Sequence, residues 1–177
     1  ESRVLEARAA LKFLKEKYPK ASLGLQGYSL GGLTAMGLVG QYPRTFKTMV
    51  LWAAATQMGI NGDTTYDAAV RKAMKEGRAV YKDWTDITLT RQFVSGFVGV
   101  NVENNLSRYT GALLTVRGDQ DFLPIRDPDW LKLAPTEDKA FILMGGADHI
   151  FHVLDETKSG YSERLLQHTT NWFDRTL

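Results

Sequence analysis

The sequence contains no cysteine, and this absence removes several chemistries at once. A disulfide framework, a thiol nucleophile and a cysteine-ligated zinc site are all excluded. Histidine is scarce as well, with three in the chain: His149, His152 and His168. Asp148 adjoins one of them, but so small a set of nitrogen and carboxylate ligands is a weak metal signal. We therefore expect neither a metal site nor a cofactor.

Long apolar runs and blocks of like charge are also missing. No stretch approaches the roughly 18 to 20 apolar residues that a membrane-spanning helix needs, and no signal peptide opens the chain. The 22 basic and 20 acidic residues are well mixed and give a net charge of +2. No run of lysines or arginines resembles a track for a phosphate backbone. We expect a soluble, cytoplasmic protein with no membrane span and no nucleic-acid partner.

The pattern of apolar residues predicts the fold class. A chain of 177 residues, 44% of them hydrophobic, is enough for one core, so we expect a single domain over residues 1–177. Apolar strand-like runs alternate with helical patterns along the chain, the strands being expected at 22–26, 47–53, 112–117 and 139–144. This alternation predicts an α/β protein with a mostly parallel sheet and helices on both faces.

Residues 54–109 lose that rhythm. This segment gains Gly, Asn, Asp and scattered aromatic residues, and we expect helical pieces near 66–75 and 90–98. We interpret it as a lid inserted into the domain. Its aromatic residues are candidates for an apolar substrate pocket, although aromatic residues at such spacings are more often simple core. They are Tyr66, Trp84, Phe93 and Phe97.

The most informative motif is a G-x-S-x-G pentapeptide, Gly27-Tyr28-Ser29-Leu30-Gly31, between a strand-like run and a helical run of small residues. At a sharp strand-to-helix turn the serine takes a strained backbone conformation that lifts its hydroxyl clear of the sheet. The flanking glycines keep neighbouring chains from colliding. Ser29 is therefore a candidate nucleophile, with Tyr28 beside it as a candidate substrate contact. The alternative is that Ser29 only caps the following helix.

Two later strand-like runs end in groups that would activate a serine. One is followed by Asp119 and Asp121, and the other by a loop that holds His149 and His152. The order Ser, Asp, His excludes the two common protease orders, which place the histidine before the serine. Because the carboxyl ends of parallel strands meet at one edge of a sheet, these groups are expected to lie together.

The residue types suit acyl transfer. A serine hydroxyl is a weak nucleophile until a base accepts its proton, and histidine is the usual base. A carboxylate that accepts the other ring N–H fixes the tautomer and stabilises the imidazolium. Asp121 and Asp119 are both candidates for this carboxylate, and Asp119 is the fallback, because it directly follows a glycine, where an acid commonly binds turn backbone. His168 lies in the final helix and is expected to be a solvent-edge side chain.

Taken together, these motifs resemble the α/β-hydrolase superfamily, and within it the small esterase and acyl-hydrolase branch. The resemblance spans nearly all of the sequence and is carried by residues 27–32, 118–124 and 146–149. It implies a triad of Ser29, His149 and Asp121, with His149 preferred over His152 by its spacing and by the preceding Gly-Ala-Asp.

The activity that this resemblance implies is hydrolysis of a small carboxylic ester through an acyl-enzyme. Thioesterases and peptidases use the same triad, and a non-catalytic or truncated protein that only binds a small ligand is a further interpretation. A dehalogenase would carry an aspartate in place of Ser29.

An acyl transfer enzyme also needs donors for the oxyanion, normally two. The first would be the backbone N–H of Leu30, at the start of a helix. The resemblance implies a second donor from a loop that follows an earlier strand, and no such loop precedes Ser29 in this sequence. We therefore expect that the chain is a fragment lacking N-terminal strands of the sheet, or that a second chain completes it.

Overall fold

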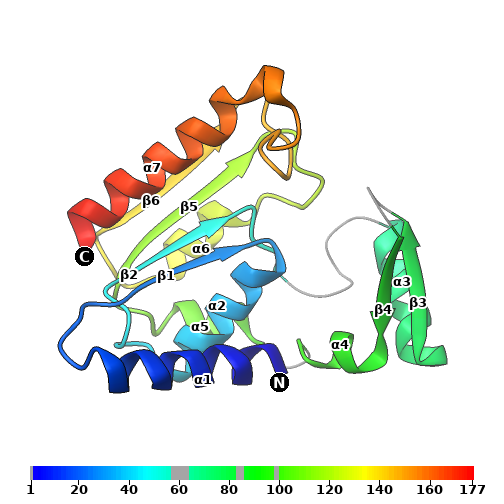
Figure 1. Ribbon diagram of the computed structural model, residues 1–177, viewed down its shortest axis with the longest axis horizontal. Coiled ribbons are helices and arrows are strands. Elements are labelled where there is room, and N and C mark those ends of the chain that lie inside the picture. Colours follow the sequence, from blue (N-terminus) through cyan, green and yellow to red (C-terminus); the bar gives the residue numbers. More distant parts are fainter. Residues whose placement is uncertain (1, 57–63, 83–85, 98–99) are drawn as a thin grey trace.

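The computed structural model describes residues 2–56, 64–82, 86–97 and 100–177. Its main sheet has four strands, all parallel, in the spatial order β1-β2-β5-β6. They are β1 (Gly24–Tyr28), β2 (Thr48–Trp52), β5 (Ala112–Gly118) and β6 (Lys139–Met144). Helices lie on both faces of this sheet (Figure 1), which confirms the predicted α/β fold class.

The two faces bury different sets of side chains. One core cluster joins the sheet to α1 (Ser2–Lys17), α2 (Leu30–Gln41), α5 (Val102–Leu106) and α6 (Asp127–Leu133). The other joins it to α7 (Gly160–Thr176), which follows a short 3₁₀ helix at Glu156–Lys158. Successive residues of β2 alternate between the two, with Met49 and Leu51 in the first cluster and Val50 in the second. This is the period of two expected for a strand covered on both faces.

A separate group of elements lies beyond the carboxyl ends of β1 and β2 (Figure 1). It consists of α3 (Thr64–Glu76), the antiparallel hairpin of β3 (Arg78–Lys82) and β4 (Asp86–Thr90), and α4 (Arg91–Ser95). The helical pieces expected near 66–75 and 90–98 correspond to α3 and α4, but the sequence analysis missed the hairpin. The interpretation of residues 54–109 as a lid stays a prediction, and α5 at its end packs against α2.

Strand ends decide where the functional groups lie. The strand expected at 22–26 runs instead over Gly24–Tyr28, so Ser29 follows it directly. Among the described residues β1 pairs only with β2. An additional strand beside β1, from an N-terminal segment or a second chain, stays a prediction.

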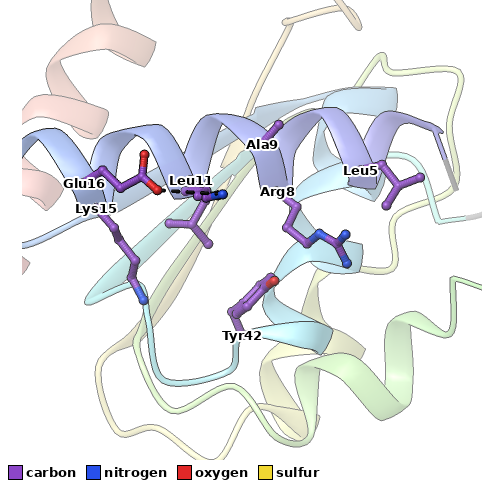
Figure 2. Close-up of a pocket in the computed structure, with 8 residues that line it drawn as sticks. Leu5, Arg8, Ala9, Leu11, Lys15, Glu16 and Tyr42 are labelled. Carbon is purple, nitrogen blue, oxygen red and sulfur yellow. Dashed lines mark ion pairs between the residues drawn. The ribbon is translucent and has the colours of Figure 1, made fainter.

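Helix α1 borders an open surface groove of about 580 Å³ (Figure 2). Side chains of α1 and Tyr42 form its walls, and Lys12 and Glu16 form an ion pair there at 3.8 Å. Exposed pairs of this kind add little stability. None of the residues that line this groove also lines the cavity at Ser29.

Among the described residues, no helix is long and apolar enough to cross a bilayer.

Tyr109 provides a test of the core. Its side chain is fully buried, and its hydroxyl lies 3.3 Å from the carbonyl oxygen of Ala112. Burial raises the pKa of Tyr109 well above its ordinary value, and burial beside Tyr81 and Asp67 raises the pKa of Tyr66 to about 12. Between the unfolded value of about 10 and these higher values, the unfolded chain loses protons that the native state keeps. The free energy of unfolding therefore falls as pH rises through this range.

We expect the free energy of unfolding of Tyr109→Phe to fall less than that of the wild type between about pH 9 and pH 11. Phenylalanine has no hydroxyl that can ionise, so position 109 no longer loses a proton on unfolding. Urea unfolding at both pH values measures the difference. Tyr18→Phe is the matched control, because Tyr18 follows α1 directly and its side chain is exposed. Equal losses in Tyr109→Phe and the wild type would contradict this account.

Candidate active site

Ser29 occupies a strained turn between β1 and α2. Its φ of 50° and ψ of −121° lie in a region that residues other than glycine rarely adopt. The turn is held by backbone bonds: the Ser29 N–H donates to the Trp52 carbonyl at 2.9 Å, and the Ser29 carbonyl accepts from Gly32 and Ala55 at 2.9 and 3.0 Å. The Ser29 side chain makes no capping hydrogen bond to α2, so the interpretation as a simple helix cap is wrong.

Two of the glycines around Ser29 are required by space. A Cβ on Gly27 would lie 2.7 Å from the Gly31 carbonyl oxygen, and a Cβ on Gly32 would collide with the side chain of Ala54. A Cβ on Gly31 would meet no described atom within 4 Å. The close approach of β1, α2 and the loop after β2 therefore depends on Gly27 and Gly32.

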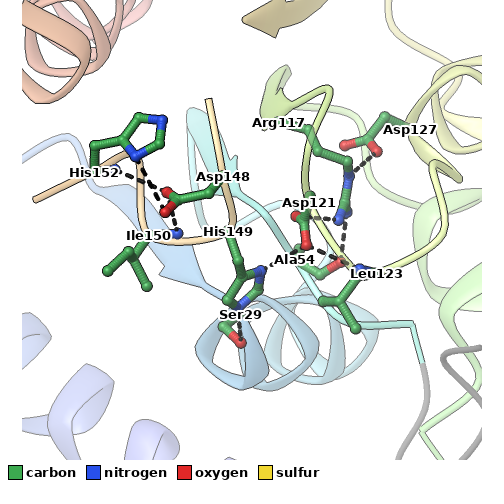
Figure 3. A network of polar contacts seen from close by, with 10 residues as sticks. All are labelled: Ser29, Ala54, Arg117, Asp121, Leu123, Asp127, Asp148, His149, Ile150 and His152. Atoms are coloured by element: carbon green, nitrogen blue, oxygen red, sulfur yellow. Dashed lines mark hydrogen bonds and ion pairs between the residues drawn. The ribbon is translucent and has the colours of Figure 1, made fainter. Parts of the chain in front are cut away.

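The structure brings the three predicted triad residues together (Figure 3). His149, in the loop after β6, places Nδ1 at 2.8 Å from Asp121 Oδ1 and Nε2 at 3.0 Å from Ser29 Oγ. A carboxylate only accepts hydrogen bonds, so Nδ1 carries the proton and donates it. In the neutral imidazole Nε2 is then free to accept from the Ser29 hydroxyl. The geometry is that of a hydroxyl facing a base whose tautomer is fixed by an acid.

The Asp121 carboxylate is buried and bound on both oxygens. Oδ1 also accepts from the Leu123 N–H at 2.9 Å, and Oδ2 accepts from Arg117 Nη1 at 2.9 Å. Arg117 in turn donates from Nε to Asp127 Oδ2 at 2.6 Å. The sequence analysis missed Arg117 and Asp127. The available signal was a charged residue inside the apolar run of β5.

The competing residues have other partners. Asp119 Oδ1 accepts from the Gly146 N–H at 2.7 Å, as expected of an acid in a turn. His152 Nε2 donates to the Gly146 carbonyl at 2.8 Å, and its backbone N–H donates to Asp148. His168 is exposed on α7. Asp119 and His152 therefore shape the turns around His149. Within the described ranges, no group of three or more acidic or histidine side chains is placed to hold a metal ion.

An apolar cavity of about 170 Å³ opens beside Ser29 and His149. Tyr28 and Phe122 flank the His149 imidazole, with ring centroids 5.5 and 4.5 Å from it. The lining comes from the carboxyl ends of the main sheet and from α3, the β3–β4 hairpin and α4. The residues are Tyr28, Ser29, Leu30, Ala55, Tyr66, Tyr81, Ile87, Leu89, Phe93, Phe122, Leu123 and His149. The β3–β4 hairpin thus forms part of the wall of the site.

The predicted substrate contacts divide into three groups. Tyr28 and Phe93 line the cavity, as does Tyr66. Phe97 does not line it: this side chain is 4% exposed and packs in the main core, with its ring 5.5 Å from that of Phe93. The expectation for Phe97 is thus corrected, because the residue belongs to the core. Trp84 lies outside the described residues.

Tyr66 contributes an uncharged hydroxyl to the cavity wall. Desolvation, with smaller contributions from Tyr81 and Asp67, raises the pKa of Tyr66 to about 12, so its hydroxyl stays protonated. The Tyr66 and Tyr81 rings meet edge to face at 5.1 Å. Such a wall suits an apolar group.

Leu30, the predicted oxyanion donor, is the first residue of α2 and lines the cavity. The first four N–H groups of a helix have no partner within it, and they carry the positive end of the helix dipole. The Leu30 N–H therefore lies beside Ser29 in an environment that favours an anion. Its function as a donor, and the source of a second donor, stay predictions.

A comparison with known families agrees with this architecture. The family model described as serine aminopeptidase, S33, matches residues 2–158, which is most of the chain. The chain belongs to this family. Its membership confirms the predicted place in the α/β-hydrolase superfamily. No curated protein matches the chain.

Solved structures place this S33 family member among α/β-hydrolase folds. The esterase domain of a Rhodothermus marinus protein shares 23% identity, with a TM-score of 0.62 over 89% of this chain and 65% of that one. A monoacylglycerol lipase from Paleococcus ferrophilus shares 15%, with a TM-score of 0.69 over 96% and 76%. The Pyrococcus furiosus esterase PF2001 shares 17%, with a TM-score of 0.66 over 98% and 62%. At these identities the likeness establishes the fold, and the chain spans about two thirds of the length of these proteins.

Proposed function

We propose that this protein is a serine hydrolase that cleaves small carboxylic esters through a covalent acyl-enzyme. The observation that carries the proposal is the hydrogen-bonded row of Asp121, His149 and Ser29, with distances of 2.8 and 3.0 Å. The strained backbone of Ser29 supports it, because strain is retained where the surrounding structure holds a residue for function.

In the proposed reaction, Ser29 Oγ attacks the ester carbonyl carbon while its proton passes to His149 Nε2. Asp121 stabilises the resulting imidazolium, and the Leu30 N–H at the start of α2 binds the oxyanion. The tetrahedral intermediate then expels the alcohol, which takes the proton from His149. Water attacks the acyl-enzyme with His149 again as base, and the carboxylic acid leaves.

The cavity beside Ser29 indicates the size of the acyl group. An apolar cavity of about 150 Å³ holds one benzene molecule, so the volume of about 170 Å³ fits a benzoyl group or a short aliphatic acyl chain. Its apolar lining provides no charged partner for a polar acyl group. In this proposal α3 and the β3–β4 hairpin form the cap over the acyl group.

The cavity chemistry favours an ester over the substrate of an aminopeptidase. An aminopeptidase must bind a free α-amino group, and a buried ammonium requires a carboxylate partner. No acidic residue is among the described residues that line the cavity. The family description includes aminopeptidases, but the described lining of this pocket offers an ammonium group no carboxylate partner.

A series of p-nitrophenyl esters tests the proposal. We expect an initial burst followed by turnover, with kcat/KM highest for butanoyl to benzoyl groups and at least about tenfold lower for dodecanoyl, which exceeds the cavity. Leu89→Trp fills the cavity from the hairpin and shifts the preference toward acetyl, while Ser29→Ala gives no burst. Well-folded wild type with no turnover of any ester would favour the alternative of a non-catalytic binding protein.

A further inference from the structure

Behind the proposed triad lies a buried ion pair that the ester reaction described above does not use (Figure 3). Arg117 on β5 is fully buried, as is Asp127 at the start of α6. The guanidinium makes three bonds: Nε donates to Asp127 at 2.6 Å, Nη1 to Asp121 at 2.9 Å, and Nη2 to the Ala54 carbonyl at 2.6 Å. It thus joins the acid of the triad to the first turn of α6 and to the loop after β2.

Burying three charges is costly, so the arrangement requires a reason beyond stability. Asp127 Oδ1 is buried with no hydrogen-bond partner among the described residues, so this carboxylate is kept although one of its oxygens is unsatisfied. Arg117 alone would neutralise the charge of Asp121. With Asp127 added, the charges of the three side chains sum to −1, the value that a lone triad aspartate would have.

The other charged groups nearby are directed elsewhere. Asp148, in the loop of His149, accepts from the backbone of Ile150 and His152, and Asp119 accepts from Gly146. On α6, Arg126 and Asp129 are exposed and pair with each other. The neutral ring of Trp130 lies 6.0 Å from the Arg117 guanidinium carbon. Arg117, which binds Asp121, and Asp127, which binds Arg117, are therefore the charged side chains that act on the Asp121 carboxylate from the side away from His149.

We infer that Arg117 and Asp127 are positioning residues for acyl transfer, an inference that rests on the proposed function. Arg117 holds the Asp121 carboxylate with Oδ1 toward His149. Asp127 acts through Arg117 and keeps the buried group at a charge of −1, so that it stabilises the imidazolium formed when Ser29 attacks. Neither residue exchanges a proton or contacts the substrate.

The variant Asp127→Asn predicts the direction in which the pH dependence of Ser29 reactivity should shift. The amide keeps the shape and an oxygen for Arg117, but the charge of the group becomes zero. The imidazolium of His149 is then less favoured, so the neutral base persists to lower pH and is a weaker base. We expect the pH of half-maximal Ser29 reactivity to fall by about 0.5 to 1 unit and the plateau to fall about three- to tenfold.

The measurement is the rate of phosphonylation of Ser29 by a fluorophosphonate, followed by mass spectrometry between about pH 4 and pH 9. Asp129→Asn, on the exposed face of α6, is the matched control and should keep the wild-type midpoint. Arg117→Met/Asp127→Asn leaves Asp121 as the sole charge and should return the midpoint to within about 0.3 unit of the wild type. The plateau of this double variant stays low because Asp121 is no longer held.

An unshifted midpoint in folded Asp127→Asn would overturn the inference, whatever happens to the plateau. If Asp127→Asn fails to fold, the double variant decides, because it leaves one buried carboxylate, Asp121, without the guanidinium, whereas Arg117→Met alone leaves two. A midpoint of the double variant displaced from the wild type by more than about half a unit would then overturn the inference. Failure of the proposed function looks different, because Ser29 of the folded wild type would then not react with the probe at any pH.

Discussion

Replacing His149 with alanine is expected to lower kcat for ester hydrolysis by about 10⁴- to 10⁶-fold and to leave KM nearly unchanged. The imidazole Nε2 lies 3.0 Å from Ser29 Oγ and is the acceptor of the hydroxyl proton in the proposed reaction. Without it the hydroxyl must attack while still protonated. Substrate binding depends on the apolar cavity, most of which is unaffected by the change.

Steady-state kinetics with p-nitrophenyl butanoate measures this effect. His168→Ala is the matched control, because His168 is exposed on α7 and is not among the residues that line the cavity. It should keep wild-type kcat. A His149→Ala protein that retains more than about a tenth of the wild-type kcat would show that another group serves as the base.

Arg117→Met is expected to have the largest effect on stability. It leaves two buried carboxylates, Asp121 and Asp127, without the guanidinium that binds both. Breaking a buried ion pair by removing one partner costs about 3 to 5 kcal/mol, because the remaining charge is uncompensated. In a chain of this size the melting temperature should fall by roughly 10 °C.

Chemical denaturation at pH 7 measures this loss. Arg126→Met is the control, because Arg126 is half exposed and its pair with Asp129 spans 3.9 Å, so its removal should cost less than about 0.5 kcal/mol. The double variant Arg117→Met/Asp127→Asn should recover part of the loss. Equal stability of Arg117→Met and the wild type would mean that the buried charges do not depend on the guanidinium.

The main features of the site were predictable because local sequence determines them. Ser29 lies in a strand-to-helix turn whose glycines are fixed by close contacts, and Gly27 is one of them. Asp121 follows the fully buried strand β5, and His149 follows the mostly half-buried edge strand β6, so both lie at the carboxyl ends of neighbouring parallel strands. Parallel strands bring such positions together whatever the sequence between them.

The parts that the sequence analysis missed depend on distant partners. Arg117 is visible as a charge inside the apolar run of β5, but the local sequence does not show which acids it binds, one three residues beyond the strand and one at the start of α6. The β3–β4 hairpin consists of two strands of five residues each, in which exposed and less exposed residues alternate, but so short a pattern does not stand out beside the helical patterns around it. Phe93 lies in α4 and Phe97 lies two residues beyond its end, four residues apart, and only the packing shows that the first lines the cavity while the second belongs to the core.

The most direct test of the account is to find which residue a fluorophosphonate modifies. Folded wild-type protein is treated near neutral pH, digested and mapped by mass spectrometry. The account predicts a single adduct on the peptide that contains Ser29, lost in Ser29→Ala and at least about a thousandfold slower in His149→Ala. An adduct on any other residue, or an unmodified Ser29 in folded protein, would contradict it.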